Sequence, residues 1–314
     1  MAENTVKKIA TRESYGNSLK ELAEEFPNLV VLDADLAAAT KTGIFRKAYP
    51  DRHIDCGIAE ENMMGVAAGL SLVGKIPFVS SFAMFAAGRA FEQVRNSIGY
   101  PHLNVKIGAT HAGITVGEDG ATHQCNEDIA LMRTIPGMVV MCPSDDVEAR
   151  AAVRAALEYE GPVYIRFGRA AVPVINDHPG YHFEIGKGTV VREGKDVTIV
   201  ATGICVDSAL GAAKMLEEEG ISAEVVNICT IKPLDEEIIL NSAKKTGKVV
   251  TVEEHSVIGG LGSAVCDCLS AKLPTPVKKV GMQDVFGESG SAAALVEKYG
   301  LDAKGVYKSV KEFL

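Results

Sequence analysis

The sequence contains no tryptophan, and aromatic residues make up only 6% of its 314 residues. It has no apolar run long enough to span a bilayer, and residues 1–12 are too polar and charged for a signal peptide. It also lacks any block of Lys and Arg, and its formal net charge is −9. These absences argue against nucleic acid or a membrane as partner. We therefore expect a cytoplasmic protein.

Cysteine pairs and phosphate-binding loops are absent as well. None of the seven cysteines forms a Cys-x-x-Cys pair, and Cys266-x-Cys268 has no histidine at metal-ligand spacing. Their apolar or helical contexts favour buried, reduced thiols. Gly259-Gly260-Leu261-Gly262 matches neither the Walker nor the dinucleotide pattern, and is more typical of a tight turn with close helix packing. The chain is therefore predicted to hold neither a diphosphate nor its metal ion.

What the chain does contain is a repeated alternation of short β-branched runs with helical patterns. This alternation predicts an α/β fold of two doubly wound domains with mainly parallel sheets. In the first block the predicted strands are Leu29–Asp33, Ile76–Ser80, Asn104–Ile107, Met138–Met141 and Val163–Phe167, and the predicted helices are Thr11–Glu25, Glu61–Leu72, Phe85–Ile98, Glu127–Arg133 and Asp145–Tyr159. In the second block the strands are Val197–Ala201, Ala223–Asn227, Val249–Val252 and Val277–Val280, and the helices are Asp207–Glu219, Asp235–Lys245, Gly260–Leu269 and two near 290–299 and 303–314.

Between the two blocks lies a stretch that resembles an inter-domain linker. Residues 170–196 hold two prolines, two histidines and several glycines, without clear periodicity. The predicted division is a first domain over residues 1–170, a linker over 171–196 and a second domain over 197–314.

Polar and aromatic residues follow four of the strands predicted for the first domain. Asp35-Leu36 follows the first strand, Phe82–Phe85 the second, His111–His123 the third and Arg169 the fifth. In open α/β sheets, ligands bind beyond the carboxyl ends of the strands. We therefore expect these residues to gather at one edge of the sheet.

A carboxylate stands at the start of a Gly- and Ala-rich helix in Gly57-Ile58-Ala59-Glu60-Glu61-Asn62. The simplest interpretation of Glu60 is helix capping, because the helix dipole stabilises acidic side chains in the first turn. Glu61 would fill that role equally well. The alternative is a carboxyl group in an apolar pocket that bonds a heterocycle nitrogen and shares a proton with it. The spacing alone leaves both interpretations open.

Two histidines bracket an irregular polar loop. His111 precedes Gly117-Glu118-Asp119-Gly120-Ala121-Thr122-His123-Gln124, in which His123 follows a threonine and an acid. A single histidine is most often structural, but two in one such loop leave a structural and a binding role equally open. Imidazoles beside a carbonyl substrate can bond hydroxyls or stabilise a developing oxyanion.

Two arginines and two phenylalanines complete the candidates. Arg12 and Arg169 each lie at the end of a predicted element, where an isolated arginine is usually solvated or salt-bridged. Together with His111 they would suit a phosphate dianion through charge-assisted bonds. Phe82 and Phe85, three residues apart, are either core residues or a stacking platform for a flat heteroaromatic ring.

These residues together resemble the C-terminal half of transketolase, a thiamine-diphosphate enzyme, over nearly the whole chain from Ala10. The motifs that carry the resemblance are Ala34-Asp35-Leu36, Gly57-Ile58-Ala59-Glu60, Ser81-Phe82-Ala83-Met84-Phe85, Val116–Gln124, Arg133-x-x-Pro136, Cys142-Pro143-Ser144-Asp145 and Ile165–Arg169. The resemblance implies a pyrimidine-binding domain before the linker and a transketolase C-terminal domain after it.

For the cofactor, the resemblance implies that Glu60 bonds N1′ of the aminopyrimidine of thiamine diphosphate and acts as a catalytic residue. Phe82 and Phe85 would flank the pyrimidine ring, and Asp35 and Leu36 would lie near the cofactor. The run Ala86-Ala87-Gly88, after Phe85, adds one residue relative to many members of the family and supplies no third aromatic ring.

For the substrate, the resemblance implies that His111, Asp119 and His123 bind the hydroxyls and carbonyl of a ketose, with both histidines taking part in catalysis. Arg12 and Arg169 would hold the terminal phosphate alongside His111. The implied reaction transfers a two-carbon ketol unit from a ketose phosphate to an aldose phosphate.

A partner chain is also implied. Full-length transketolases precede this region with a half that binds the diphosphate and Mg²⁺, whereas here Met1 opens almost directly onto Arg12. The resemblance therefore implies one subunit of a split transketolase, completed by an N-terminal, diphosphate-binding subunit. A dimer of such heterodimers is expected.

Three alternatives stay open. A 1-deoxyxylulose-5-phosphate synthase shares Gly-Ile-Ala-Glu, and the β subunit of a 2-oxoacid dehydrogenase is also a free-standing chain of these two domains. The third is a non-catalytic subunit, which the retained polar residues argue against, since such groups are costly to bury without a role. In the second domain, Glu253-Glu254-His255 is the one polar cluster that suggests an interface.

Overall fold

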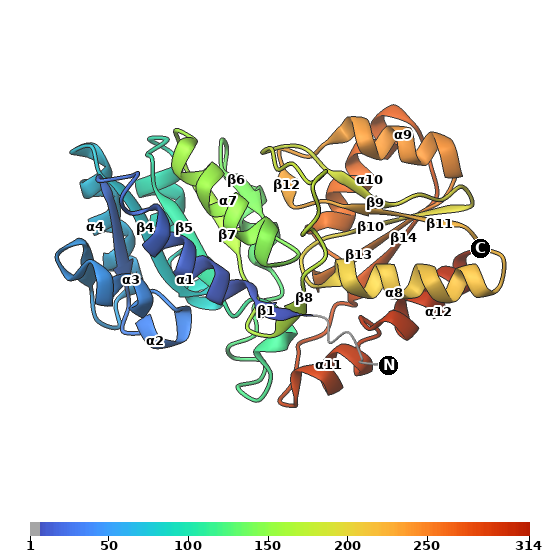
Figure 1. The fold of residues 1–314 in the computed structure, drawn as a ribbon, viewed down its shortest axis with the longest axis horizontal. Helices are drawn as coiled ribbons and strands as arrows, with labels where there is room; N and C mark the ends of the chain where they lie inside the picture. The colour runs from blue at the N-terminus through green and yellow to red at the C-terminus, as the bar shows by residue number, and fades with distance from the viewer. Residues whose placement is uncertain (1–6) are drawn as a thin grey trace.

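The computed structural model describes residues 7–314 as two α/β domains, each built on its own sheet (Figure 1). The strands of the first sheet are, in spatial order, β12 (Thr230–Lys232), β6 (Val139–Met141), β7 (Val163–Arg166), β5 (Lys106–Thr110), β4 (Ile76–Phe82), β2 (Leu29–Asp33) and β3 (His53–Asp55). All neighbours pair in parallel except β12, which is antiparallel to β6. Six parallel strands thus end at one edge.

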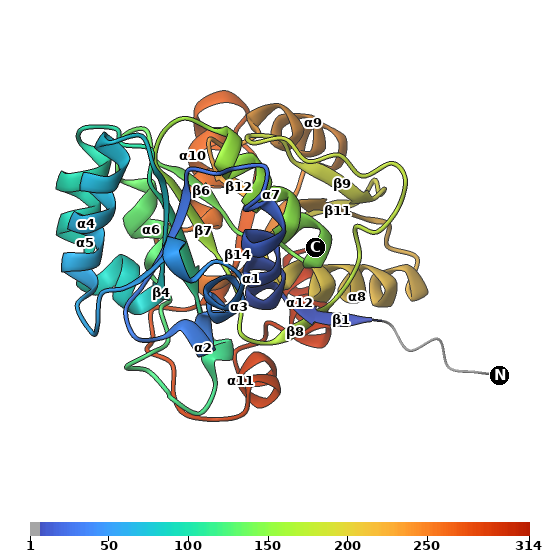
Figure 2. The ribbon, with the colours of Figure 1, turned by 60° about the vertical axis from the view of Figure 1, so that its left-hand side comes forward.

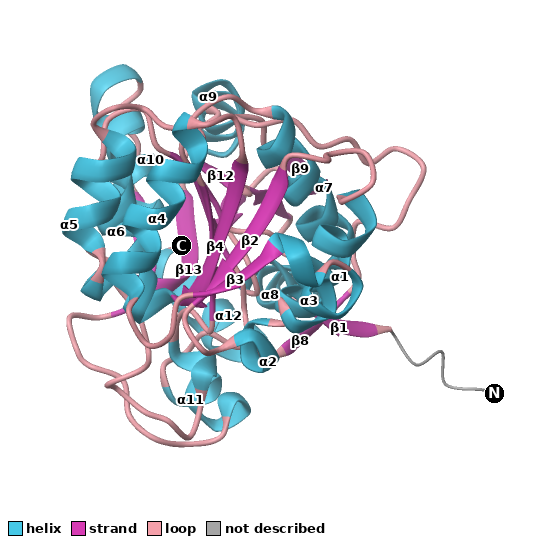
Figure 3. Ribbon diagram, turned by 90° about the vertical axis from the view of Figure 1, so that its left-hand side faces the viewer, coloured by secondary structure: helices cyan, strands magenta, loops and turns pink. Residues whose placement is uncertain are grey.

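Helices cover both faces of this sheet (Figure 3). One face carries α4 (Glu60–Leu72), the π-helix η2 (Met84–Arg89), α5 (Phe91–Gln93), the π-helix η3 (Val94–Gly99) and α6 (Asp128–Arg133). The other carries α1 (Thr11–Leu22), α3 (Gly43–Ala48) and α7 (Asp146–Glu158). Shorter turns are α2 (Ala37–Thr40) and the 3₁₀ helices η1 (Pro50–Arg52) and η4 (Ile114–Val116). With helices on both faces, every residue of the central strands β4 and β5 is buried.

The second sheet has five strands, in the order β14 (Val277–Met282), β13 (Val249–Ser256), β10 (Val197–Ala201), β11 (Ala223–Asn227) and β9 (Thr189–Arg192). Only β9 is antiparallel to its neighbour. The helices of the second domain are α8 (Cys205–Glu218), α9 (Glu236–Thr246), α10 (Leu261–Lys272), α11 (Ala292–Lys298) and α12 (Ala303–Phe313). Asp235 is the N-cap of α9, and its side chain accepts a hydrogen bond from the Ile238 amide. Asp145 caps α7 in the same way, through the Glu148 amide.

The two domains are joined through shared elements. Strand β12 belongs to the C-terminal half of the chain, yet it extends the sheet of the first domain. One apolar core continues from α4 and α6 into α10. A two-stranded ribbon of β1 (Lys8–Ala10) and β8 (Ala171–Pro173) lies between the start of α1 and α8 (Figure 2). The halves therefore pack as one body.

The predicted fold class, two doubly wound α/β domains with mainly parallel sheets, is confirmed. Five short strands depart from the sequence prediction: β1, β3 and β12, together with β8 and β9 in the linker segment 171–196. We retain the division into residues 1–170, 171–196 and 197–314 as a proposal. Residues 1–6, part of the segment predicted not to be a signal peptide, lie outside the described residues.

The predicted helix Phe85–Ile98 is instead a short α-helical turn between two π-helices. The Ala90 amide donates to the carbonyl of Phe85, five residues back, at 3.1 Å. A π-turn accommodates one more residue than an α-turn. Such a turn could accommodate the extra residue expected in Ala86-Ala87-Gly88, which stays a prediction.

Three smaller expectations can be compared with residues 7–314. All seven cysteines are free, with five buried and Cys56 and Cys266 half-buried. Gly259 and Gly260 form the predicted tight turn before α10, with Gly260 packed against Glu253. Within these residues every helix is too short or too polar to span a bilayer.

Candidate active site

Glu60 is the first residue of α4 and its side chain is only 3% exposed. Ala59 precedes it without a side-chain cap, so the helix begins with its amide groups directed at this edge. Glu61, the alternative carboxylate, is exposed. The Glu60 carboxylate pairs with Arg89, whose Nη1 lies 3.4 Å from Oε2. Glu60 is thus a buried carboxylate with a half-exposed cation beside it.

The π-helix η2 places Phe85 and Arg89 together. The Arg89 guanidinium lies 4.7 Å from the centroid of the Phe85 ring, and the Phe85 ring lies nearly parallel to Phe82 at 5.8 Å. Phe85 is half-buried, whereas Phe82 is buried and stacks on His111 at 3.9 Å. Phe85 therefore offers an aromatic surface to solvent, and Phe82 supports a histidine.

His111 directly follows β5, lies in the left-handed region with φ of 55°, and is buried. Its Nε2 lies 3.1 Å from Arg12 Nη1, and its Nδ1 lies 2.9 Å from Thr110 Oγ1. Because a guanidinium can only donate, Nε2 is the acceptor, and Nδ1 carries the proton that it donates to Thr110. Burial lowers the pKa of His111 to about 3, assisted by the charges of Arg12, Arg169 and Lys41. The imidazole is thus neutral at physiological pH.

The state of this imidazole gives a testable pH dependence. Its pKa in the folded chain lies below the ordinary value of 6.5, so its contribution to stability is complete above pH 6.5. That contribution is lost as the pH falls toward 3, because the unfolded chain then binds the proton more readily. NMR of the labelled imidazole should show His111 neutral at pH 5, with the same chain in denaturant as reference. A folded-state titration near pH 6.5 would mean that the ring is solvated.

Positive charges converge around His111. Arg12 lies in the first turn of α1, and its Nη1 also donates to the carbonyl of Ala39 at 2.8 Å. Burial lowers the pKa of Arg12, and the charge of Arg169 lowers it further. Lys41 adds a third cation near the His111 ring. The structure therefore brings together Arg12, His111 and Arg169, the three residues predicted to suit a phosphate.

The loop between His111 and Gln124 is built on glycine turns. Gly117 and Gly120 both have positive φ, and the Gly120 amide bonds the carbonyl of Gly117 at 3.1 Å. This turn leaves Glu118 and Asp119 exposed at its tip. His123 lies on the inner side, with its ring edge-on to Phe85 at 5.4 Å. The two histidines therefore meet at the Phe82–Phe85 pair, whereas Asp119 is exposed to solvent.

Asp35 and Leu36 lie at the end of β2, at the same edge. Asp35 is exposed with φ of 59°, and its amide donates to Asp55 Oδ1 at 3.1 Å. Buried Asp33 accepts hydrogen bonds from the hydroxyls of Thr40 and Thr42 at 3.1 and 2.9 Å. Burial raises the pKa of the Asp33 carboxyl. Asp33 thus fixes the turn that carries Asp35 and Leu36.

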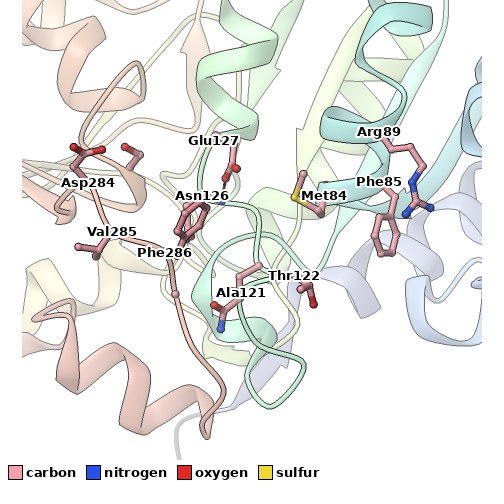
Figure 4. A pocket seen from close by; sticks show the side chains of 13 residues that line it. Met84, Phe85, Arg89, Ala121, Thr122, Asn126, Glu127, Asp284, Val285 and Phe286 are labelled. Atoms are coloured by element: carbon pink, nitrogen blue, oxygen red, sulfur yellow. Dashed lines mark hydrogen bonds between the residues drawn. The ribbon is translucent and has the colours of Figure 1, made fainter.

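A cleft of about 700 Å³ adjoins these residues, between the domains. In Figure 4, Met84, Phe85 and Arg89 lie on one side and Asp284, Val285 and Phe286 on the other, with residues 121–127 between them. Glu60 and the His111 cluster do not line the cleft, but Phe85 and Arg89 connect it to them. The Phe286 side chain is 85% exposed.

The chemistry of these groups can be compared with the implied cofactor. The buried Glu60 carboxylate at a helix start and the Phe85 ring, both in contact with Arg89, fit a flat, protonatable heteroaromatic ring, because they supply one acceptor and one stacking surface. Within residues 7–314, no group of three or more His, Cys, Asp or Glu is arranged to hold a metal.

Sequence reasoning missed Arg89, Lys41 and Asp33. Arg89 follows Phe85 by four residues, which places both on one helical face, and this spacing could have indicated it. Asp33 ends a strand two residues before Asp35, and a Thr-x-Thr pair follows within ten residues. No sequence pattern indicates that Lys41 lies near His111, because its position depends on a left-handed backbone conformation with φ of 71°.

Comparison with known proteins places the chain among defined relatives. The family model "Transketolase, pyrimidine binding domain" matches residues 7–174, and "Transketolase, C-terminal domain" matches residues 186–306. The chain is 49% identical to the 6-deoxy-6-sulfo-D-fructose transketolase subunit SqwH of Clostridium sp. (strain MSTE9), over 96% of this chain and 93% of that one. It is 40% identical to one of the subunits of the apulose-4-phosphate transketolase of Phocaeicola vulgatus, over 98% of both. A solved structure described as "Split gene transketolase, inactive beta4 tetramer" matches with a TM-score of 0.89 and 59% identity, over 98% of both chains.

Proposed function

The chain belongs to the transketolase family and corresponds to its pyrimidine-binding and C-terminal domains, and on that premise we propose that it is one subunit of a split, thiamine-diphosphate-dependent transketolase. The proposed reaction moves a two-carbon ketol unit from a ketose phosphate to an aldose phosphate. The observation that carries the proposal is the buried Glu60 carboxylate, linked to Phe85 through Arg89, at the edge where His111 and His123 converge.

Glu60, Phe85 and Phe82 would hold the pyrimidine end of the cofactor. Glu60 would hold or share a proton with the ring nitrogen through its carboxylate, and its burial strengthens that bond. Phe85 would stack on the ring, with Phe82 behind it, and Asp35 and Leu36 would line the approach. When bound, thiamine diphosphate supplies the carbon nucleophile and the electron sink that cleavage next to a carbonyl requires.

Arg89 would then act as an exchangeable partner of Glu60. Its guanidinium is half-exposed, so leaving the carboxylate costs little solvation. In the chain alone it covers the acceptor that the cofactor nitrogen would use.

His111, His123 and Asp119 would bind the sugar. Because His111 is neutral and receives a hydrogen bond from Arg12, it would act as a dipolar and orienting group rather than as a cation. His123 would donate to the carbonyl or a hydroxyl group of the ketose. Arg12 and Arg169 would attract the terminal phosphate, although the chain as a whole is acidic.

The anionic group of the donor sugar is the next point to decide. The subunits similar to this chain are named for a sulfosugar and for apulose 4-phosphate, which carry different anionic groups. An arginine pair suits either a sulfonate or a phosphate, because both present oxygens to a guanidinium fork. We propose a ketose phosphate because Arg12, Arg169 and Lys41 concentrate positive charge around the neutral His111 ring, which suits a dianion.

The diphosphate and its Mg²⁺ would be bound by a second, N-terminal-type subunit, with a dimer of heterodimers as the assembly. The similar solved structure is a tetramer of β chains described as inactive. We expect the same of this chain in isolation.

The test is transfer from xylulose 5-phosphate to ribose 5-phosphate with thiamine diphosphate and Mg²⁺. The chain is assayed alone and with a diphosphate-binding subunit shown by sedimentation to form a complex with it. We expect activity in the mixture only. Turnover by the chain alone would contradict the split arrangement.

The alternatives predict other outcomes of the same assay. A complex that decarboxylates a 2-oxoacid but transfers no ketol unit would indicate a dehydrogenase-type subunit. Condensation of pyruvate with glyceraldehyde 3-phosphate would indicate a synthase. No reaction of any kind would indicate a non-catalytic subunit.

A further inference from the structure

We propose that the C-terminal domain positions the substrate loop, residues 111–124, and that Glu254 is the positioning residue through which it does so. The proposal rests on the proposed function for its effect on substrate, but the contacts themselves are independent of it. Glu254 lies on β13 of the second domain, and its bonds go to Thr115 and Arg166, neither of which is assigned above to cofactor or substrate.

Glu254 reaches from the second domain into the loop of the first. Its Oε1 accepts a hydrogen bond from the Thr115 amide at 2.6 Å, and both residues are buried. A backbone amide bonded to a carboxylate makes a short, strong bond, and it satisfies a donor that a loop would otherwise leave unpaired. The carboxylate therefore fixes the middle of the segment between the two histidines.

The loop backbone is shaped to fit this carboxylate. Gly113 has φ of 75°, and a Cβ built on it would overlap the Glu254 carboxylate. The Gly113 amide bonds the carbonyl of Cys125 at 2.9 Å, which closes the loop on itself. Only glycine allows both this conformation and this close approach. Gly113 and Glu254 thus form a matched pair across the domain boundary.

A buried arginine holds Glu254 in place. Arg166 Nη2 donates to the carbonyl of Glu254 at 2.7 Å, and its Nη1 lies 3.9 Å from the carboxylate. Its Nε bonds the Asp128 carboxylate at 2.9 Å. Burial raises the pKa of Glu254, and the charge of Arg166 opposes that effect. The loop, the sheet of the first domain and β13 therefore share one ion network.

A second contact secures the other end of the loop. Gln124 Nε2 donates to the carbonyl of Glu288 in the second domain at 2.9 Å, and lies 3.2 Å from that of Ile114 within the loop. Gly287 approaches so closely that a Cβ there would overlap the Gln124 side chain. The loop is therefore held on two sides by residues from the same neighbouring domain.

Glu253 provides a matched control. It is the preceding residue of β13 and is also buried, but its side chain turns into its own domain. Its carboxylate accepts the amides of Leu261 and Gly262 at 2.7 and 2.8 Å, at the start of α10. Replacing it by alanine removes a buried carboxylate that accepts two backbone hydrogen bonds, without touching the substrate loop.

The experiment compares Glu254→Ala, Glu254→Gln and Glu253→Ala in the complex with the diphosphate-binding subunit. We expect Glu254→Ala to raise KM for the donor sugar and lower kcat/KM by about tenfold or more, because small misplacements of binding groups have such effects. The thiamine diphosphate concentration for half-activity should not change. Glu254→Gln keeps an acceptor for Thr115 and should restore part of the loss. Glu253→Ala should lower the melting temperature but leave KM unchanged.

Hydrogen exchange on the chain alone gives a readout that needs no activity. The amides of residues 112–124 should exchange faster in Glu254→Ala than in Glu253→Ala, relative to the sheet strands. Equal effects of the two variants on loop exchange and on KM would overturn the proposal. An inactive wild-type complex would contradict the proposed function, while loop exchange would still decide the positioning role. If Glu254→Ala does not fold, the same loop exchange and KM are compared between Glu254→Gln and Glu253→Ala.

Discussion

Replacing Glu60 by glutamine should lower the rate of ketol transfer by about 100-fold or more, the range found when a positioned proton-transfer group is lost. Glutamine has nearly the same shape and keeps an acceptor oxygen, but it cannot hold or share a proton with a ring nitrogen. Because Glu60 pairs with an arginine that is itself half-exposed, the fold should tolerate the change. The measurement is kcat in the two-subunit complex, together with the melting temperature.

Glu61→Gln is the natural control for that variant. Glu61 occupies the next position in the first turn of α4 but is exposed. If the carboxylates matter only through the helix dipole, the two variants should behave alike, since both lie in the same turn. Near wild-type turnover of Glu60→Gln would remove Glu60 from the catalytic assignment.

Replacing Arg166 by methionine should lower the free energy of unfolding by about 3–5 kcal/mol, the usual consequence of removing one member of a buried ion pair. Arg166 is 4% exposed and lies between Asp128 and Glu254, both of them buried. Without the guanidinium, two carboxylates remain in a low-dielectric interior with no cation between them. Urea denaturation of the chain, followed by circular dichroism, measures the difference.

The same substitution at Arg150 separates a buried pair from a surface one. Arg150 also contacts two carboxylates, Glu21 at 2.8 Å and Asp146 at 3.0 Å, but its side chain is 36% exposed. Surface pairs contribute about 0–1 kcal/mol, so Arg150→Met should have a small effect. Equal losses at the two positions would show that the buried pairs of Arg166 stabilise the chain no more than surface pairs do.

The edge that gathers the site could be predicted from the sequence because it follows from the topology. Parallel strands place the residues after their carboxyl ends together, and His111 and Arg169 meet as that rule requires. Arg12 reaches them from α1, which follows strand β1 of the separate ribbon, so the rule does not cover it. The position of Asp119, at the tip of the substrate loop, does not follow from the topology. The resemblance groups Asp119 with the two histidines, yet the turn from Gly117 to Gly120 leaves it exposed to solvent, and whether it binds substrate stays a prediction.

Elements that depend on tertiary partners escaped prediction. Strands β3 and β12 have only three residues each, too few for an alternation to be recognised, and they form because a neighbouring strand offers free hydrogen-bonding groups. The two π-helices within residues 84–99 also escaped prediction, because no hydrophobic period indicates a π-turn. The Glu253-Glu254-His255 cluster did suggest an interface, but only the structure shows that Glu254 faces the other domain and Glu253 does not.

Strand β12 has a consequence for the order in which the chain can acquire its structure. A ribosome releases the six parallel strands of the first sheet, which end at Arg166, well before residues 230–232. Until then β6 is an edge strand, and an open edge is a template for pairing with other chains. In the nascent first domain, β6 therefore stays an unpaired edge strand until residues 230–232 have been synthesised. Strand β12 covers this edge only after it has been synthesised. A chain truncated before residue 230 would therefore leave β6 exposed and the sheet prone to aggregate.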